Sequence, residues 1–342
     1  MGCNLRDLAQ PETLELSELA GQKIGVDAFL TAYQFLTTIR DRSPEGDGGP
    51  LKASNGRVVS HLMGFLNRTT TLLAAGIKPV FIFDGKPPEL KADEIAMRKA
   101  RRDEARAVHQ QALEAGDFAL AQKMAQRIIS YTPEMVAETK QLLDLLGVPW
   151  VDAAAEGEGQ AAVMATLGQL DAVATQDWDA LLYGSPVLIR NMMTAGNKSH
   201  GRVVKAQKII LNDLLSEHQL TREQLIDLAI MIGTDFHPGI KGIGPKTGIK
   251  LIKQFGDIET ICQEKGKDVP ERLDEIRAIF HNHPSTKVAN DKLQMGQVDV
   301  AGLQQFLQAD RQFSQRRMDN AMEKLKQAGL IRESGQTSLF SF

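Results

Sequence analysis

The sequence is poor in cysteine, in net charge and in long apolar runs. Cys3 and Cys262 are its only cysteines, which argues against a disulfide framework or a cysteine-based zinc site and favours a reducing compartment. The formal net charge is −3, so any nucleic-acid binding has to come from local basic patches. No apolar run approaches membrane-spanning length, and no signal peptide is visible. We therefore expect an intracellular protein without membrane association.

Short buried strands alternate with helical segments through the first two thirds of the chain. Strands are predicted at residues 22–28, 79–83, 148–151, 170–175 and 187–190. This alternation predicts an α/β fold with a mostly parallel, doubly wound, twisted sheet flanked by helices. The last third is predicted to be helical, and Thr221 with Gln224 three residues on has the spacing of a capping box at a helix start.

Acidic residues recur where the predicted strands end. In four separate segments an acid lies at or just beyond the carboxyl end of a strand, the edge at which sites of parallel sheets form. Two of these acids are followed two residues later by another acid, which crowds like charges together. With one more from the last third, the set comprises Asp27, Asp84, Glu156, Glu158, Asp177, Asp179 and Asp235.

These acids have two explanations. A carboxylate after a strand can cap the following helix, and for any single position this is about as good an account as a functional one. Seven together, with two acid-x-acid pairs, are better explained by a hard cation such as Mg²⁺, which prefers oxygen ligands. Two such ions about 4 Å apart can activate a water and stabilise the leaving oxygen of a phosphodiester. The sequence therefore predicts a two-metal site.

A basic helix is predicted just after Asp84. Residues 89–145 have a helical composition, with a break at Gly116 and Asp117. Lys91 and Arg98 lie near the start of this segment, from which they could reach a phosphate held at the metals. Acidic residues are interleaved with the basic ones, so for the run alone an ordinary solvated helix face is the better interpretation.

A glycine-rich turn opens a helix in the last third. The stretch Gly242-Ile-Gly-Pro-Lys-Thr-Gly248 presents backbone amides at a helix N-terminus, which suits a phosphate, and Lys246 and Lys250 add positive charge. Such a turn between helices grips a DNA backbone without reading its sequence. The alternative is a plain interhelical turn. Tyr33, on the helix after Asp27, is either a stacking platform for a base or a core tyrosine.

The end of the chain carries apolar residues in a polar setting. Gln336 is followed by Leu339, Phe340 and Phe342. This spacing suits a short linear motif that docks one helical turn into a pocket of a partner. The alternative is a disordered end.

These residues resemble an archaeal-type flap endonuclease of the structure-specific 5′ nuclease superfamily (XPG-like), nearly end to end. The blocks that carry the resemblance occur in family order. They are Val26-Asp-Ala28, Tyr33-Gln-Phe-Leu36, Ser60-His-Leu-Met-Gly64, Phe83-Asp-Gly-Lys-Pro-Pro88, Ala155-Glu-Gly-Glu158, Thr175-Gln-Asp-Trp-Asp179, Gly233-Thr-Asp235 and Gly242-Ile-Gly-Pro-Lys246. Gly157 stands where the family more often has alanine.

The resemblance implies a role for each matching residue. The seven acids match the metal ligands, with Glu156 and Glu158 mainly at a first metal and Asp177, Asp179 and Asp235 mainly at a second. Lys91 and Arg98 match the pair that engages the scissile phosphate. DNA contacts are implied for Tyr33, Arg40, Arg68, Gly233, Gly242, Gly244, Lys246 and Lys250. The residues of the tail motif, Gln336, Leu339, Phe340 and Phe342, resemble the motif that docks on a PCNA-type sliding clamp.

The resemblance also implies a domain organisation. It comprises an N-terminal nuclease region (1–98), a helical gateway or arch (99–145), an internal nuclease region (116–258) that overlaps the gateway and contains a helix-two-turn-helix (233–256), a C-terminal helical region (259–334) and a clamp-binding tail (335–342). At the helix-two-turn-helix the family binds K⁺ through backbone carbonyls.

The implied function is that of a monomeric Mg²⁺-dependent 5′ flap endonuclease with 5′-to-3′ exonuclease activity, in which Mn²⁺ can substitute for Mg²⁺. Its setting would be Okazaki-fragment maturation and repair, and its location the cytoplasm, associated with the nucleoid. Two alternatives stay open: a Holliday-junction or exonuclease member of the same superfamily, and a catalytically silent clamp-binding DNA scaffold.

Overall fold

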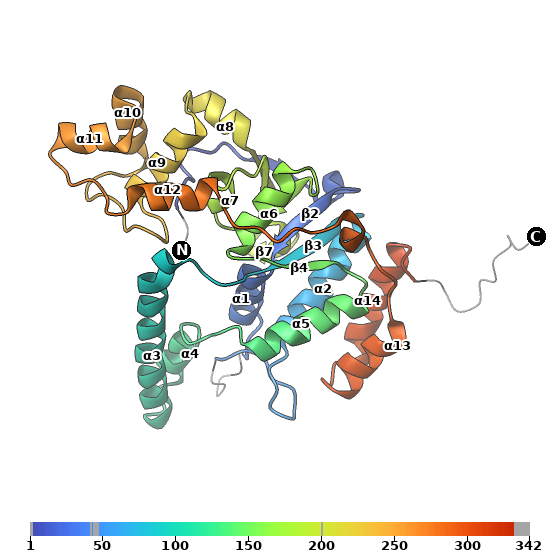
Figure 1. Cartoon of the computed structure of the whole chain (residues 1–342). Coiled ribbons are helices and arrows are strands. Elements are labelled where there is room, and N and C mark those ends of the chain that lie inside the picture. The colour runs from blue at the N-terminus through green and yellow to red at the C-terminus, as the bar shows by residue number, and fades with distance from the viewer. Residues whose placement is uncertain (1–2, 42, 44–47, 200, 332–342) are drawn as a thin grey trace, which may run out of the picture.

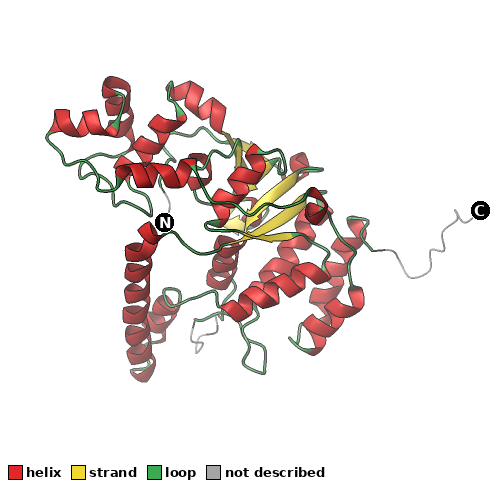
Figure 2. Ribbon diagram, viewed as in Figure 1, coloured by secondary structure: helices red, strands yellow, loops and turns green. Residues whose placement is uncertain are grey.

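A sheet sandwiched between helices forms the body of the molecule (Figure 2). The computed structural model describes residues 3–41, 43, 48–199 and 201–331. Within them the sheet has seven strands in the order β1-β9-β6-β5-β2-β3-β4. Their bounds are β1 (Glu12–Leu14), β2 (Lys23–Asp27), β3 (Lys78–Phe83), β4 (Trp150–Asp152), β5 (Ala172–Ala174), β6 (Val187–Arg190) and β9 (Ala206–Ile210).

The sheet is mostly parallel, as predicted. Strands β4, β3, β2, β5 and β6 run parallel, whereas β9 pairs antiparallel with β6 and β1 pairs antiparallel with β9. The five predicted strands are all present. The antiparallel edge of β1 and β9 was not predicted, and a separate hairpin pairs β7 (Lys198–Ser199) with β8 (Arg202–Val203).

Apolar side chains of the central strands pack on both faces of the sheet. In β3, Val80 and Ile82 belong to one buried core, while Phe81 and Phe83 belong to another, because successive side chains of a strand point to opposite faces. This is why the strand reads as a continuous apolar run. The first core includes residues of α6 (Gly157–Thr166), α7 (Asp179–Leu182), α8 (Leu211–His218) and α9 (Arg222–Ile232). The second includes residues of α1 (Ala28–Thr38), α2 (Ser60–Ala74), α5 (Pro133–Leu145), α13 (Val300–Leu303), η5 (Gln304–Ala309) and α14 (Gln315–Gln327).

A helical hairpin extends away from the sheet on one side (Figure 1). It follows η2 (Glu89–Lys91) and consists of α3 (Ala92–Glu114) and α4 (Phe118–Ala125), which pack on each other. The predicted break falls between them, and Asp117 caps α4 by accepting a hydrogen bond from the Leu120 N–H at 3.0 Å. Helix α5 packs instead against α2. The part of the predicted gateway that extends from the body is therefore α3 and α4.

Four helices gather at another corner of the molecule (Figure 1). They are α9, α10 (Pro245–Phe255), α11 (Ile258–Lys265) and α12 (Leu273–His281). The predicted capping box at Thr221 and Gln224 is present at the start of α9. The chain then continues through η4 (Asn290–Leu293) to α13. The short 3-10 helices η1 (Leu16–Leu19) and η3 (Met192–Thr194) complete the elements.

Two further sequence expectations concern the tail motif and membrane association. Gln336, Leu339, Phe340 and Phe342 lie outside the described residues, so the tail motif stays a prediction. Among the helices of the described ranges, none combines the length and the apolarity that a membrane crossing requires.

Candidate active site

The acids converge because their strands are neighbours. Strand β2 lies between β3 and β5, and all three are parallel, so their carboxyl ends meet at one edge of the sheet. Asp27 ends β2 and caps α1, accepting a hydrogen bond from the Leu30 N–H at 2.9 Å. The capping and the functional explanations of this residue are therefore compatible.

Asp84 and Glu156 meet between β3 and α6. The Asp84 Oδ1 accepts a hydrogen bond of 2.7 Å from the Gly157 N–H, at the first position of α6. A Cβ on residue 157 would come within 2.8 Å of that oxygen. Glycine at this position therefore lets the carboxylate lie directly against the start of the helix, next to Glu156.

Two further acids, Glu158 and Asp179, are held by groups that the sequence analysis did not single out. Glu158 accepts a hydrogen bond of 2.5 Å from the Thr175 hydroxyl, just before Asp177. Asp179 accepts one of 2.7 Å from the backbone N–H of Cys3, which brings the start of the chain to the site. The role of Thr175 could have been predicted, because this threonine lies two residues before Asp177 in the sequence. The contact between Cys3 and Asp179 could not, because it spans 176 residues of sequence.

Burial and mutual repulsion make several of these carboxylates unusually hard to ionise. Burial and the nearby Asp84 raise the pKa of Asp27 to about 8. Burial raises the pKa of Asp179 to about 7, against the opposing hydrogen bond from Cys3. Burial, followed by the charges of Asp177 and Asp27, raises the pKa of Glu158 well above its usual value. A cation bound among these carboxylates would therefore strongly stabilise their ionised forms.

Lys91 supplies part of that positive charge. Its ammonium lies 2.5 Å from the Glu156 Oε2 and 3.0 Å from the Asp235 Oδ2. Burial alone lowers the pKa of Lys91, but the two carboxylates outweigh it and hold the pKa above its usual range. Burial alone raises the pKa of Asp235, but Lys91 helps to hold it below its usual range. Arg98 also reaches Asp235, with its Nη2 3.0 Å from the Oδ2.

The donor set fits divalent cations, although the side chains are not arranged around one. Within the described ranges, no three acidic, histidine or cysteine side chains converge on a common point at ligand distances. Acidic groups outnumber the two basic side chains, Lys91 and Arg98, that reach them, and all donors are oxygens, which Mg²⁺ prefers. Ion binding would require rearrangement of the acidic side chains and release of Lys91 from Glu156 and Asp235.

The predicted DNA contacts of the N-terminal half lie in different surroundings. Tyr33 is 44% exposed, so the alternative of a core tyrosine is wrong, and its ring is free to stack. Arg40 is half-buried, at the start of the loop that leads to α2. Arg68 is 6% exposed and donates hydrogen bonds to the carbonyls of Met192 and Ala195. The structure therefore places Arg68 inside the fold, and its DNA contact stays a prediction.

The glycine-rich turn adopts the predicted turn-to-helix form. Gly244 precedes α10, and Gly233 and Gly242 have positive φ angles of 122° and 89°, which disfavour other residues. Lys246 and Lys250 are exposed on α10. The turn thus presents open backbone and positive charge on one surface.

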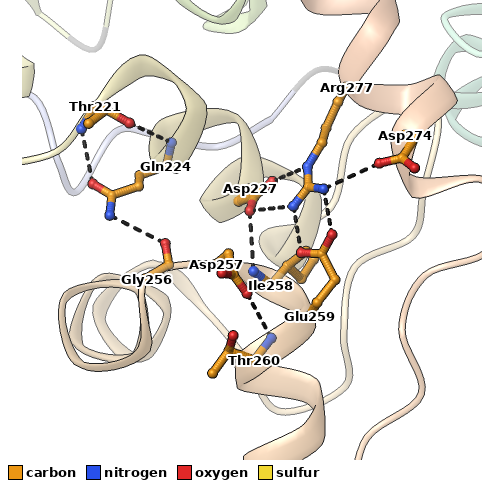
Figure 3. A network of polar contacts seen from close by, with 10 residues as sticks. All are labelled: Thr221, Gln224, Asp227, Gly256, Asp257, Ile258, Glu259, Thr260, Asp274 and Arg277. Carbon is orange, nitrogen blue, oxygen red and sulfur yellow. Dashed lines mark hydrogen bonds and ion pairs between the residues drawn. The ribbon is translucent and has the colours of Figure 1, made fainter.

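An ion-pair network holds the helices around this turn, and sequence reasoning missed it (Figure 3). Arg277 on α12 donates to both oxygens of Asp227 on α9 at 2.7 Å, and to both oxygens of Glu259 on α11 at 2.6 and 2.7 Å. Asp227 also accepts the Ile258 N–H at 3.2 Å. One guanidinium therefore fixes α9, α11 and α12 relative to one another.

Comparison with known proteins defines the class. The families described as XPG N-terminal domain and XPG I-region match residues 4–105 and 147–235. These two regions contain all seven acids and leave most of the α3–α4 hairpin between them. The matched regions are those of an XPG-type nuclease.

Individual relatives give a more specific assignment than the family models do. The flap endonuclease 1 of Methanosarcina barkeri is 43% identical over 332 residues, which cover 95% of this chain and 96% of that protein. The flap endonuclease 1 of Pyrococcus furiosus is 42% identical over 348 residues, covering 100% and 99%. The chain belongs to the flap endonuclease 1 family.

Solved structures agree with this assignment. The structure of flap endonuclease-1 from Methanococcus jannaschii covers 96% of this chain and 98% of its own, with a TM-score of 0.73 and 34% sequence identity. The catalytic core of Rad2 in complex with a DNA substrate covers 96% and 100%, with a TM-score of 0.69 and 23% identity. The second likeness shows the shared fold alone.

Proposed function

We propose that the seven-acid cluster holds two Mg²⁺ ions with which this enzyme cuts DNA at the base of 5′ flaps. The chain is a structure-specific 5′ flap endonuclease and thus a DNA hydrolase, as its family membership indicates. The observation that carries the metal proposal is the crowding of acids from β2, β3, β5 and α6 at one sheet edge, with pKa values raised by burial and mutual repulsion. Divalent metals are in general use in this family.

The chemistry is divided between the ions and the chain. Two bound divalent ions would activate a water and stabilise the leaving oxygen of the phosphodiester, and Mn²⁺ would substitute for Mg²⁺. Glu156 and Glu158 would serve mainly the first ion, and Asp177, Asp179 and Asp235 mainly the second. Lys91 and Arg98 start from carboxylate partners and would turn to the scissile phosphate, where their charges favour the transition state.

Substrate selection would come from two further surfaces, the α3–α4 hairpin and the glycine-rich turn. The α3–α4 hairpin would admit a free 5′ single strand, which makes the enzyme selective for structure rather than sequence. Exposed Lys246 and Lys250 beside the open glycine turn would grip the duplex backbone, with K⁺ bound at backbone carbonyls of the turn. The exposed ring of Tyr33 would stack on a base near the cut.

Further activities and partners follow from the same site and from the tail. A 5′-to-3′ exonuclease activity would use the same acids at a nick. Residues 336–342 would dock on a sliding clamp of the PCNA type. The protein would work as a monomer at the nucleoid, in Okazaki-fragment maturation and repair.

A substrate panel tests the proposal. We expect Mg²⁺-dependent cleavage of a double-flap DNA at the junction, slower cleavage at a nick and little cleavage of a four-way junction. A flap whose 5′ end carries a bulky block should resist cleavage if the free end has to pass the hairpin. Preferred cleavage of the four-way junction would contradict the flap assignment, and equal cleavage of blocked and free flaps would contradict the gateway.

A further inference from the structure

A mostly irregular segment, which contains η4, links the helices that would hold duplex DNA to the acid cluster. Residues 282–298, named here the crossing segment, leave α12 and run across the body of the molecule to α13 (Figure 1). Thr286 fastens the segment to α6, exchanging hydrogen bonds of 3.0 and 2.6 Å with the Gln160 side chain. The Gly296 N–H donates to the Gly147 carbonyl at 2.7 Å.

His283 is the point at which the crossing segment reaches a candidate metal ligand. Its Nε2 lies 3.0 Å from the backbone carbonyl oxygen of Glu156. Because a carbonyl only accepts, Nε2 carries the hydrogen. The same oxygen also accepts the Gln160 N–H at 3.0 Å, the first helical bond of α6. The two donors together fix the backbone of Glu156 at the start of the helix.

The imidazole ring is enclosed rather than lying loosely on the surface. His283 is 8% exposed, and its Nδ1 is buried without a partner among the described residues. The ring lies over the first turn of α6, where a Cβ on Gly159 would come within 2.6 Å of three of its carbons. The ring of Tyr183, which follows α7, packs against the imidazole with 4.9 Å between centroids. The enclosed position of the His283 ring therefore requires glycine at 159, and the surrounding groups hold the ring in one orientation.

We propose that His283 is a positioning residue that orients the Glu156–Glu158 turn for metal binding. Glu156 and Glu158 flank the first position of α6, so a shift of the Glu156 backbone moves both carboxylates. Through α12 and Arg277, the same segment is continuous with the helices around the glycine-rich turn. The proposal rests on the two-metal function above and adds a residue to it that touches neither metal nor substrate.

The expected loss in metal affinity can be judged from residues that orient metal ligands in other proteins. Removing a residue that orients a metal ligand typically weakens metal affinity or activity by about 10- to 100-fold. The loss should appear in metal affinity and in the Mg²⁺ concentration needed for cleavage. The KM for flap DNA at saturating Mg²⁺ should stay unchanged, because His283 is buried and offers no surface to the substrate.

Three variants separate the hydrogen bond from the ring. His283→Phe keeps an aromatic ring and removes the donor, whereas His283→Gln removes the ring and keeps an N–H donor. His281→Phe is the matched control, because His281 is exposed and two residues away on the same stretch. Mn²⁺ binding is measured by electron paramagnetic resonance of the free ion, without DNA, and Mg²⁺-dependent cleavage is measured in parallel. Circular dichroism checks the fold, and His283→Met replaces the Phe variant if that one does not fold.

We expect His283→Phe to bind Mn²⁺ about 10- to 100-fold more weakly than wild type, His283→Gln to recover most of the affinity, and His281→Phe to match wild type. Wild-type Mn²⁺ affinity in His283→Phe would overturn the proposal, as would a Gln variant no better than the Phe variant. Failure of the wild-type protein itself to bind Mn²⁺ would overturn the metal centre instead, which keeps the two failures distinguishable.

Discussion

The ammonium of Lys91 lies 2.5 Å from the carboxylate of Glu156, across 65 residues of sequence. It also contacts Asp235, so the single charge of this η2 side chain is shared by two carboxylates from separate parts of the chain. Lys91 thus supplies positive charge to the acid cluster. It would give up these contacts when metal and a phosphate arrive.

This double role makes Lys91→Met informative. We expect kcat for flap cleavage to fall by about 10²- to 10³-fold, since a charge aimed at the phosphate is lost. Mn²⁺ binding by the free protein should be as strong as in wild type or stronger, because the competing ammonium is gone. Single-turnover cleavage checks the expected loss of rate, and Mn²⁺ titration checks the expected affinity. Lys99→Met, at an exposed position of α3, is the control, and weaker Mn²⁺ binding in Lys91→Met would contradict the account.

Lys246 tests the duplex-holding surface. Removing one phosphate contact should weaken flap binding at all sequences alike and reduce the slope of log K against log salt by about 1. Fluorescence anisotropy in Ca²⁺ over a range of salt concentrations measures both. Lys205→Ala removes an equal charge from a lysine that pairs with Glu15 near the antiparallel edge. Equal slopes for Lys246→Ala and wild type would remove Lys246 from the interface.

Arg277 tests the network that orders α9, α11 and α12. The Asp227 side chain is 6% exposed and the Arg277 side chain 23% exposed, so Arg277→Met leaves a nearly buried carboxylate without its partner. We expect a loss of about 3–5 kcal/mol in the free energy of unfolding, with partial recovery in Asp227→Asn/Arg277→Met. Urea unfolding provides the measurement. Asp274→Asn changes a 96% exposed partner of Arg277 and should lower the free energy of unfolding only slightly. A loss as large as that in Arg277→Met would contradict the greater importance of the buried Asp227 pair.

A second buried network gives a pH dependence away from the acids. Glu138 on α5 pairs with His61 at 3.1 Å and with Arg311 at 2.7 Å. Burial raises the pKa of Glu138, but these partners outweigh it and hold the pKa below the ordinary value of 4.5. The unfolded chain therefore takes up a proton first as the pH falls. The stabilisation by Glu138 is present above about pH 4.5 and is lost as the pH drops through the lower folded pKa.

Glu138→Gln checks this direction. At neutral pH the variant should be less stable than wild type by about 2 kcal/mol, the scale of hydrogen bonds to a charged group. The difference should shrink below about pH 4.5. Urea unfolding at several pH values measures it. A difference that grows as the pH falls would contradict the sign.

The sequence allowed the parallel sheet to be predicted because β2 to β6 are buried, apolar and separated by helices. The same alternation placed acids at strand ends, which in a parallel sheet meet by geometry alone. Strands β1 and β9 lie outside the run of parallel strands and pair antiparallel, so neither followed that rhythm. The antiparallel edge therefore escaped prediction.

Contacts across long stretches of sequence were beyond prediction for another reason. Asp227 and Arg277 are 50 residues apart on different helices, and nothing in the local sequence of either pairs it with the other. The same holds for His283, which in sequence is an unremarked histidine after α12. Only the packing of the crossing segment on α6 brings it to Glu156.

The most direct test of the acid cluster is cleavage of a 5′-labelled double-flap DNA by wild type and by Asp177→Ala, with Asp213→Ala on an exposed turn of α8 as control. The account predicts Mg²⁺-dependent cleavage by wild type and by the control. It predicts no cleavage by Asp177→Ala, which should still bind the flap in Ca²⁺. Cleavage by Asp177→Ala at a rate near that of wild type would contradict the two-metal account.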